Sequence, residues 1–239
     1  MSEASIEVFV GPSLPPAMRP ADASFRWRGP ASAGDLATLL NAPPARLCLL
    51  DGLFDSRPAP WHKELLMLMA RGTIVFGGSS MGALRAAELH RYGMIGVGVI
   101  FRAYRDGRLH GDDEVALIHA TERLDWAPLT VPMVEFRATL LAGCRARLIG
   151  PLIARRMRTI VRNIYFADRD WPVIAKACQE ADLVSTEIMN RLRGMHVQLK
   201  RQDALACLAA ARAPLVERRS CPAPPMTCFI SELLSAHGL

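Results

Sequence analysis

The chain has 239 residues and a formal net charge of +6, and 51% of its residues are hydrophobic. This is enough apolar sequence to build a sizeable core without cross-links, in one large domain or one domain with an extension. No stretch reaches the ~18 consecutive apolar residues of a membrane helix. The first residues lack the charged start and apolar core of a signal peptide. We therefore expect a cytoplasmic protein that does not bind a membrane.

The six cysteines form no C-x-x-C pair and show no spacing with histidine that suits a zinc site. We expect them to be reduced thiols that are mostly buried. The chain also lacks the G-x-x-x-x-G-K-S/T loop that cradles nucleotide phosphates. The sequence therefore predicts neither a metal site nor a bound cofactor.

Short apolar runs in the first hundred residues predict buried strands. The first three span residues 7–10, 47–50 and 73–76. A fourth run at residues 95–101 is interrupted by glycines. The polar, proline-bearing segment up to Pro30 is predicted to be a connection. Helices are predicted at residues 36–40 and 61–71 and from Met81 onward.

A small polar turn follows each of the first three strands: Gly11-Pro12-Ser13, Asp51-Gly52 and Gly78-Ser79-Ser80. Strands that alternate with helices favour a parallel sheet. The carboxyl ends of parallel strands lie at one edge of the sheet, and ligands bind there. We therefore predict an α/β fold with a small parallel Rossmann-like sheet flanked by helices, in which these three turns lie side by side.

The character of the sequence changes after Gly111. Asp112, Asp113 and Glu114 are typical of a helix start, because acids stabilise the positive end of the helix dipole, and an apolar run to residue 120 follows. Further helices are predicted at residues 131–149, 151–166, 171–193, 197–212 and 229–237. The predicted organisation is an α/β core over residues 1–128 and an all-helical C-terminal region over residues 129–239, compatible with packing on the core as one domain.

Residues 136–167 contain seven arginines and no acid. Uneven charge of this kind favours an acidic partner, although a solvated helix face is an equally good explanation. No nucleic-acid recognition motif accompanies the arginines. We therefore do not expect a nucleic-acid partner. The arginines are Arg137, Arg145, Arg147, Arg155, Arg156, Arg158 and Arg162.

The stretch from Gly78 to Gly82 fits the G-x-S-x-G pattern of a nucleophile elbow, with Ser80 in the central position. A strand, a tight turn and a helix in this order place a hydroxyl and backbone N–H groups at a helix N-terminus. Three interpretations remain open: Ser80 is a nucleophile, part of an anion-binding cradle, or only a turn residue. Ser79 could serve solely to shape the turn.

Three segments around this turn carry a family resemblance: DGLFDSRPAPWHKELL, GGSSMGALRAAELHRYGMIGVGVIF and GDDEVALIH. Together with a weaker VFVGPSL near the N-terminus, they resemble the TfuA-like family. The resemblance implies a partner of a YcaO-type enzyme in peptide backbone thioamidation, as in natural product biosynthesis. It also implies hydrolysis of a ThiS-like, thiocarboxylated sulfur carrier protein to release sulfide. ATP would be used by the YcaO enzyme.

Hydrolysis of a thiocarboxylate needs a nucleophile, a base and donors for a developing oxyanion. We assign Ser80 as the nucleophile, His62 as its base and Asp51 as the partner that orients the base. The choice of base stays open between His62, His119 and neither. His119 follows Asp112 and Asp113 in a Ser…Asp…His order, but the spacing is far shorter than in α/β-hydrolases. The backbone N–H groups of Ser13 and Met81 are candidates for binding the oxyanion, within a site floor that includes Gly11, Gly78 and Ser79.

Two charged residues on the predicted helix after Ser80 complete the candidate site. Arg85 and Glu88 either pair across one helix face, or Arg85 holds the carboxylate or thiocarboxylate at the carrier's C-terminus. Two non-hydrolytic functions stay open. One is a non-catalytic adaptor or allosteric activator of the YcaO enzyme that binds through the arginine-rich helices, and the other is a binder of small anions or nucleotides.

Overall fold

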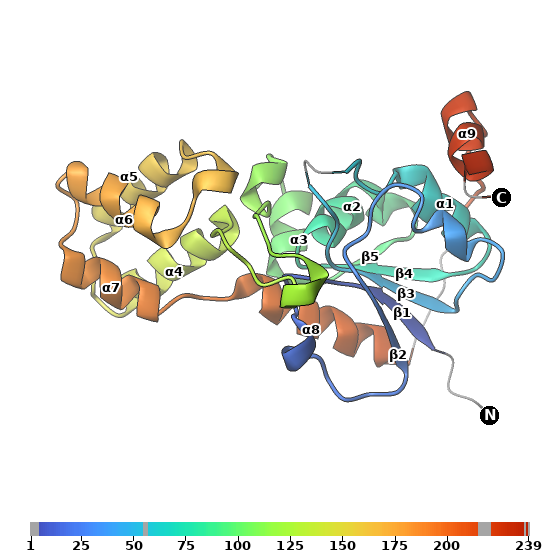
Figure 1. The fold of residues 1–239 in the computed structure, drawn as a ribbon, viewed down its shortest axis with the longest axis horizontal. Helices are drawn as coiled ribbons and strands as arrows, with labels where there is room; N and C mark the ends of the chain where they lie inside the picture. Colours follow the sequence, from blue (N-terminus) through green and yellow to red (C-terminus); the bar gives the residue numbers. More distant parts are fainter. Residues whose placement is uncertain (1–4, 55–56, 215–220, 237, 239) are drawn as a thin grey trace. The chain divides into compact units, whose positions relative to one another are not determined.

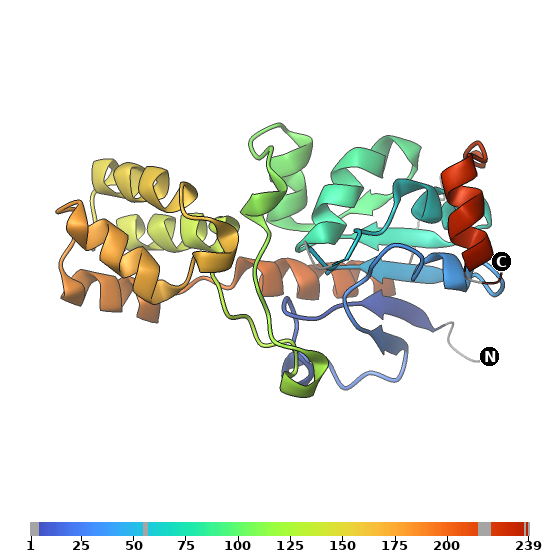
Figure 2. The same ribbon diagram turned by 45° about the horizontal axis from the view of Figure 1, so that its top comes forward.

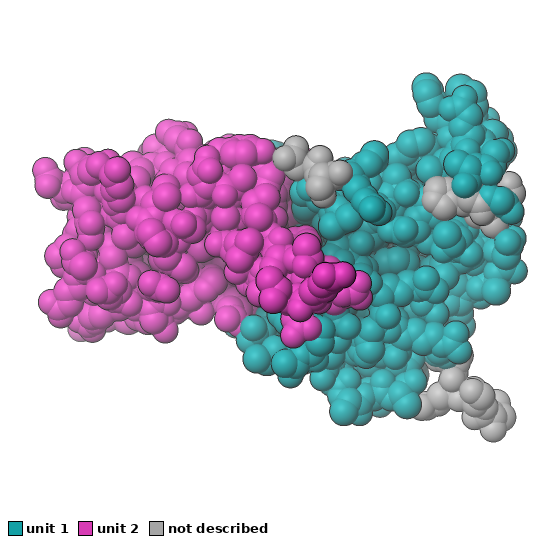
Figure 3. Space-filling view, in the orientation of Figure 1, with its two compact units in different colours: residues 1–110, 201–239 teal, residues 111–200 magenta. Residues whose placement is uncertain are grey.

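The computed structural model describes residues 5–54, 57–214, 221–236 and 238. The chain forms two compact units, which Figure 3 colours separately. Unit 1 comprises residues 1–110 and 201–239, and unit 2 comprises residues 111–200. Unit 2 is thus an insertion between two segments of unit 1. The domain boundary predicted between residues 128 and 129 is a statement about independent folding, which the division into units does not test. It therefore stays a prediction.

Unit 1 contains a five-stranded sheet in which every neighbouring pair is parallel (Figure 1). Its strands are β1 (Ile6–Phe9), β2 (Phe25–Arg28), β3 (Arg46–Leu49), β4 (Ile74–Gly77) and β5 (Ile95–Gly96). Their order across the sheet is β2-β1-β3-β4-β5. This is the order of flavodoxin-like doubly wound sheets, in which the direction of winding reverses between β1 and β3. The predicted parallel α/β fold is confirmed.

Helices cover both faces of this sheet (Figures 1 and 2). Over one face lie α1 (His62–Ala70), α2 (Met81–Leu89) and α3 (Gly98–Arg105). Over the other lies α8 (Leu199–Arg212), whose Ala204, Cys207, Leu208 and Ala211 are buried with alternate strand residues such as Val8, Cys48 and Phe76. The two-residue period of a strand explains this division of side chains between the faces. A last helix, α9 (Cys228–Ala236), follows a segment held by Lys63, whose Nζ donates to Thr227 Oγ1.

Glycines allow α2 to lie directly on the strands. A Cβ atom at Gly82 would stand 1.7 Å from the carbonyl oxygen of Leu49, and one at Gly77 would stand 2.3 Å from the carbonyl oxygen of Gly82. Neither position tolerates a side chain without moving the backbone. The N-terminus of α2 is therefore fixed against the ends of β3 and β4.

Two predictions about strands in unit 1 are wrong. The segment before Pro30 contains β2, an edge strand in which buried Phe25 alternates with exposed Arg26 and Arg28. The strand predicted at residues 95–101 ends at Gly96, and α3 begins at Gly98. Gly98 has a φ of +101°, and the next two backbone N–H groups donate to the Asp203 carboxylate at 2.9 and 2.8 Å. This carboxylate on α8 caps α3 and stops the strand.

Unit 2 is built from four α-helices around one apolar core. They are α4 (Met133–Arg145), α5 (Pro151–Arg162), α6 (Trp171–Glu180) and α7 (Thr186–Gly194). Phe136, Met157 and Leu192 are among the fully buried residues of the core. The single helix predicted at residues 171–193 is thus two helices, with Ser185 capping the second.

The structure also describes short 3-10 helices in both units: η1 (Pro16–Met18), η2 (Ala37–Leu39), η3 (His90–Tyr92), η4 (Asp112–Glu114), η5 (Glu122–Leu124) and η6 (Phe166–Asp168).

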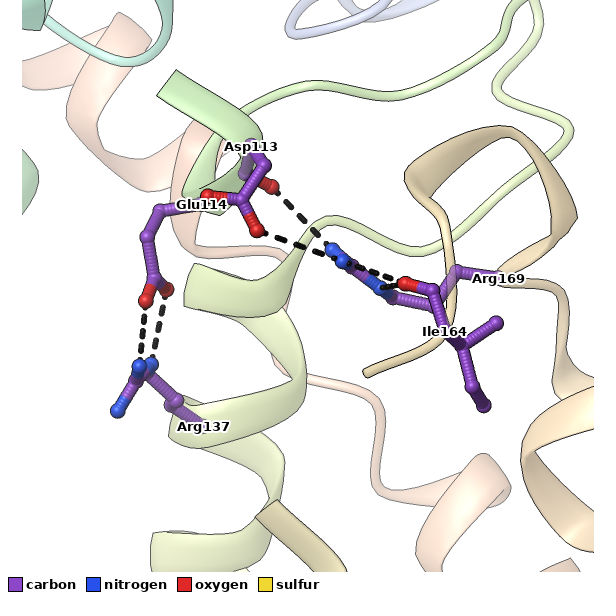
Figure 4. A network of polar contacts seen from close by, with 5 residues as sticks. All are labelled: Asp113, Glu114, Arg137, Ile164 and Arg169. Atoms are coloured by element: carbon purple, nitrogen blue, oxygen red, sulfur yellow. Dashed lines mark hydrogen bonds and ion pairs between the residues drawn. The ribbon is translucent and has the colours of Figure 1, made fainter. Parts of the chain in front are cut away.

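The helix predicted to start at Asp112 is only the single turn η4, and an extended segment follows it. Ion pairs hold this turn in unit 2 (Figure 4). Glu114 accepts a hydrogen bond of 2.8 Å from Nε of Arg137. The buried Arg169 lies 3.6 Å from Asp113 Oδ2 and donates to the carbonyl oxygen of Ile164 at 2.9 Å. Burial lowers the pKa of Arg169, and the charge of Asp113 opposes that shift. These contacts give the acidic segment a structural role.

Among the helices that the structure describes, none combines the length and the apolar character that a membrane span requires.

Candidate functional site

The three polar turns predicted to converge do lie together at the edge of the sheet. Oδ2 of Asp51, just after β3, accepts hydrogen bonds of 2.9 Å from the backbone N–H groups of Gly11 and Ser13, just after β1. Oδ1 of Asp51 accepts a hydrogen bond of 2.5 Å from Ser13 Oγ. Because the sheet order reverses between β1 and β3, this contact marks the switch point at which doubly wound sheets bind ligands.

A third side chain extends this contact to the turn after β4. Ser79 Oγ donates a hydrogen bond of 2.7 Å to Ser13 Oγ. The hydroxyl of Ser13 gives its own proton to Asp51, so the bonds form one chain from Ser79 through Ser13 to the carboxylate. Ser79, Ser13 and Asp51 are 0%, 3% and 1% exposed. We call these three residues the serine–aspartate chain. It links the ends of β1, β3 and β4 through buried polar groups.

The backbone of Ser79 is in a conformation that L-residues rarely adopt, with a φ of +68°. A left-handed conformation costs a non-glycine residue roughly 1–2 kcal/mol. In a nucleophile elbow the reactive serine occupies such a strained position between strand and helix. Ser80 has a φ of −119° and is the residue that precedes α2. The strained residue is thus Ser79, one position before Ser80, which the G-x-S-x-G pattern selects.

Ser80 is also buried, and its backbone ties the turn to β3. Its N–H group donates to the carbonyl oxygen of Leu50 at 3.2 Å, as does the N–H group of Gly82. Met81 is the first residue of α2, and the first N–H groups of a helix have no partner within the helix. Gly78 is enclosed: a Cβ atom there would lie 2.9 Å from the carbonyl oxygen of Val97. The proposed floor of the site is therefore tightly packed backbone.

The other predicted residues form a second group on α1 and α2. Nε2 of His62 lies 2.7 Å from Glu88 Oε2, and Arg85 Nη1 lies 2.8 Å from the same oxygen. Arg85 Nε also donates to the carbonyl oxygen of Pro60 at 2.9 Å. Burial alone raises the pKa of Glu88, but the hydrogen bond with His62 and the charge of Arg85 outweigh it and hold this pKa below its ordinary value. We call these three residues the His62 cluster.

The structure thus places His62 with Glu88 and Asp51 with Ser13. Of the two histidines considered as the base, only His62 belongs to the unit that holds the three turns. His119 belongs to unit 2, where its Nδ1 donates to the carbonyl oxygen of Ala120 at 2.8 Å. The catalytic roles of Ser80, His62 and Asp51 stay predictions.

The sequence predicted Ser79 as a residue of the turn and of the site floor, and the structure puts it at the end of the serine–aspartate chain. The adjacent serines both follow the strand, and no local pattern tells which one adopts a positive φ. Within residues 5–54, 57–214, 221–236 and 238, no group of three or more His, Cys, Asp or Glu side chains is arranged to hold a metal ion.

Fold and site together define an α/β protein with a doubly wound sheet and a buried polar chain at its switch point. The chain belongs to the TfuA-like family: residues 51–170, about half of its length, match the family described as TfuA-like protein. The match includes Asp51, the turn after β4 and most of unit 2, whereas the turn after β1 precedes it. No curated protein matches the chain. Family membership is consistent with a role associated with YcaO-type proteins.

Proposed function

We propose that the protein releases sulfide for a YcaO-type enzyme by hydrolysing a ThiS-like carrier whose C-terminus is a thiocarboxylate. The observation that carries the proposal is the serine–aspartate chain at the switch point of a TfuA-like protein. It joins a hydroxyl group on a strained turn to a buried carboxylate, and a carboxylate can accept the proton of an attacking hydroxyl.

The reaction proceeds in two steps. A serine hydroxyl attacks the carbonyl carbon of the thiocarboxylate, and its proton moves toward Asp51. Collapse of the tetrahedral intermediate breaks the carbon–sulfur bond, the proton passes to the leaving sulfur, and HS⁻ departs from an acyl-serine ester. Water then hydrolyses the ester to the carrier carboxylate and restores the hydroxyl. Backbone N–H groups at the start of α2, including that of Met81, stabilise the oxyanion.

Two adjacent serines compete for the role of nucleophile. The positive φ and the hydrogen bond to Ser13 support Ser79, whereas the G-x-S-x-G pattern supports Ser80. We propose Ser79 as the nucleophile. Its proton moves to Ser13, and Ser13 passes its own proton to Asp51. The His62 cluster then binds the carrier, and Arg85 attracts the negative charge at its C-terminus. Since both serines are buried, the proposal includes a local opening that admits the thiocarboxylate.

The test is sulfide release from a purified thiocarboxylated carrier by the variants Ser79→Gly and Ser80→Ala. Glycine accepts a positive φ without strain, so relief of strain in Ser79→Gly offsets the loss of the buried hydrogen bond to Ser13. We expect Ser79→Gly to lose at least about 100-fold in rate and to melt no lower than the wild type. We expect Ser80→Ala to lose less than about tenfold, because its hydroxyl lies outside the chain of hydrogen bonds.

A loss confined to Ser80→Ala would move the nucleophile to Ser80 and overturn the assignment of Ser79. Undiminished release by both variants would remove the hydroxyl mechanism altogether. A protein that never releases sulfide but changes the rate of its YcaO partner would instead be a non-catalytic adaptor.

A further inference from the structure

Six arginines at the end of α4 and along α5 are exposed on unit 2. They are Arg145, Arg147, Arg155, Arg156, Arg158 and Arg162, and we call them the arginine face. Within the part of the chain that the structure describes, none of the six forms an ion pair with a carboxylate. The face therefore carries six positive charges that the described fold leaves unneutralised.

Other arginines of the same unit have structural partners. Arg137 pairs with Glu114, and Arg169 is buried against Asp113 and a backbone carbonyl (Figure 4). By contrast, Arg158 stands three residues after Arg155 and four before Arg162, spacings at which like charges on a helix repel by a few tenths of a kcal/mol. Packing in unit 2 does not require this arrangement, because the arginines lie on the side of α5 away from the core.

The apolar side of α5 is already occupied. Met157 and Val161 are fully buried in the core of unit 2. A helix that binds a lipid surface needs its apolar face free for insertion, so α5 is not such a helix. What α5 offers to a partner is its polar side, where Arg155, Arg158 and Arg162 extend over about 10 Å of the helix axis.

Arg147 adds an observation of a different kind. It follows the last turn of α4 with a φ of +56°, and the N–H groups of Arg147 and Leu148 bond to the carbonyl oxygens of Cys144 and Gly143. This is the helix end at which glycine is the usual residue. An arginine there is less stable than glycine by about 1 kcal/mol. Despite this cost, the residue at this helix end carries one more exposed guanidinium group.

Apolar side chains lie on the same two helices. Leu141, four residues before Arg145, is 52% exposed, and Leu152, three residues before Arg155, is 69% exposed. Arginine mixed with apolar residues is typical of protein–protein interfaces. Surfaces that bind single-stranded nucleic acid present aromatic residues on which bases stack, and α5 contains none. We propose that the arginine face binds the acidic surface of a partner protein. This proposal is independent of the hydrolysis at the serine–aspartate chain.

A fluorescein-labelled helical peptide serves as the probe, about as long as α5 and with glutamates at every third or fourth position. Its binding to the full chain is followed by fluorescence anisotropy at low salt. We expect Arg155→Gln/Arg158→Gln to weaken binding at least about tenfold. The matched control is Arg191→Gln/Arg193→Gln, which removes two exposed arginines from α7 of the same unit and should change affinity less than about twofold.

A second pair of variants separates binding from folding. Asp182 follows α6 with a φ of +51° and makes the same pattern of backbone hydrogen bonds as Arg147. Arg147→Gly and Asp182→Gly should therefore both raise the melting temperature of the protein, since glycine relieves the strain in both. The gain should be smaller at Asp182, because aspartate tolerates a positive φ better than arginine does. Only Arg147→Gly should weaken binding of the acidic peptide, by about threefold or more.

Three results would overturn the proposal. The first is equal binding of the peptide by the wild type and by Arg155→Gln/Arg158→Gln. The second is an equal loss of binding in the α7 control. The third is a labelled oligothymidine strand that binds more tightly than the peptide at the same salt concentration and displaces it, because the face would then be a nucleic-acid site.

Discussion

The two units of the molecule differ in the groups that hold several of their carboxylates. In unit 1 three buried carboxylates accept hydrogen bonds from backbone N–H groups: Asp51 from the turn after β1, Glu64 from residues 34, 37 and 61, and Asp203 from the start of α3. Burial raises the pKa of Glu64 and of Asp203, and these N–H donors oppose the shift. Unit 1 thus surrounds these three carboxylates with backbone dipoles, whereas a fourth buried carboxylate, Glu7 on β1, pairs with Arg28.

Unit 2 places arginine side chains against the buried Glu114 and the partly exposed Asp113, in the pairs Glu114–Arg137 and Asp113–Arg169. Its other buried carboxylate, Glu135, accepts a hydrogen bond from the backbone N–H group of Lys200. The difference follows from architecture. A doubly wound sheet brings many strand ends and helix starts to one edge, where N–H groups lack partners, whereas a helical bundle offers few. An anionic group such as a thiocarboxylate therefore suits unit 1, and an acidic protein surface suits the arginines of unit 2.

The largest expected effect comes from the backbone contact between α2 and β3. Replacing Gly82 by Ala puts a methyl group against the Leu49 carbonyl oxygen, and we expect a loss of about 4 kcal/mol in the free energy of unfolding, measured with urea. The control is Gly194→Ala, because nothing lies within 4 Å of a Cβ atom there. That variant should be as stable as the wild type or more so. A small effect at Gly82 would mean that the turn adjusts easily.

The next effect concerns the buried cation of unit 2. Arg169→Met keeps the volume but removes the donors to Ile164 and Asp113, so we expect a loss of about 3 kcal/mol. Asp113→Asn should lose about 1 kcal/mol, because the Asp113 side chain is 42% exposed. Urea unfolding measures both variants. Equal stabilities of Arg169→Met and the wild type would contradict a stabilising role for arginine in this unit.

The corresponding change in unit 1 is Asp203→Ala. It removes the acceptor for two backbone N–H groups at the start of α3, and a lost cap of this kind costs about 2 kcal/mol. Hydrogen exchange should show faster opening of α3 than of β3, which distinguishes local loosening from general destabilisation. Uniformly faster exchange throughout unit 1 would instead show that Asp203 supports the whole sheet.

The smallest effect is expected in the His62 cluster. The pKa of Glu88 is lower in the folded state than its ordinary value of 4.5. Its stabilisation is therefore present above about pH 4.5 and is lost as the pH falls through the lower folded pKa. Glu88→Gln should cost a few tenths of a kcal/mol near pH 7, since its partners are partly exposed and screened. Melting curves of variant and wild type should converge as the pH falls well below 4.5, and a constant difference would contradict this explanation.

The sequence predicted the central strands and the meeting of the three turns, because runs such as residues 47–50 and 74–76 are apolar throughout, as buried parallel strands are. It did not reveal β2, where Phe25 and Trp27 alternate with arginines at the edge of the sheet. The end of β5 was missed because it depends on Asp203, about a hundred residues later in the chain. A local sequence pattern gives no information about contacts between residues so far apart in the chain.

The sequence also predicted only part of the candidate site. Gly11, Ser13, Asp51 and Ser79 come together because parallel strands end at one edge, which the order of strands and helices indicates. Which hydrogen bonds each side chain forms depends on the positions of its atoms to within an ångström or so. The sequence could not show that Asp51 would bond to Ser13, or that Ser79 rather than Ser80 would take the positive φ.

The return of α8 to the sheet has a consequence for synthesis on the ribosome. All five strands have been translated by residue 96, but α8, which covers the face carrying Val8, Cys48 and Phe76, follows only after the whole of unit 2. The nascent sheet therefore carries a bare apolar face while residues 111–200 are made. Unit 2, whose residues are contiguous, can fold first. A chain that ends before residue 201 would contain the whole of unit 2 but would leave this face of the sheet uncovered.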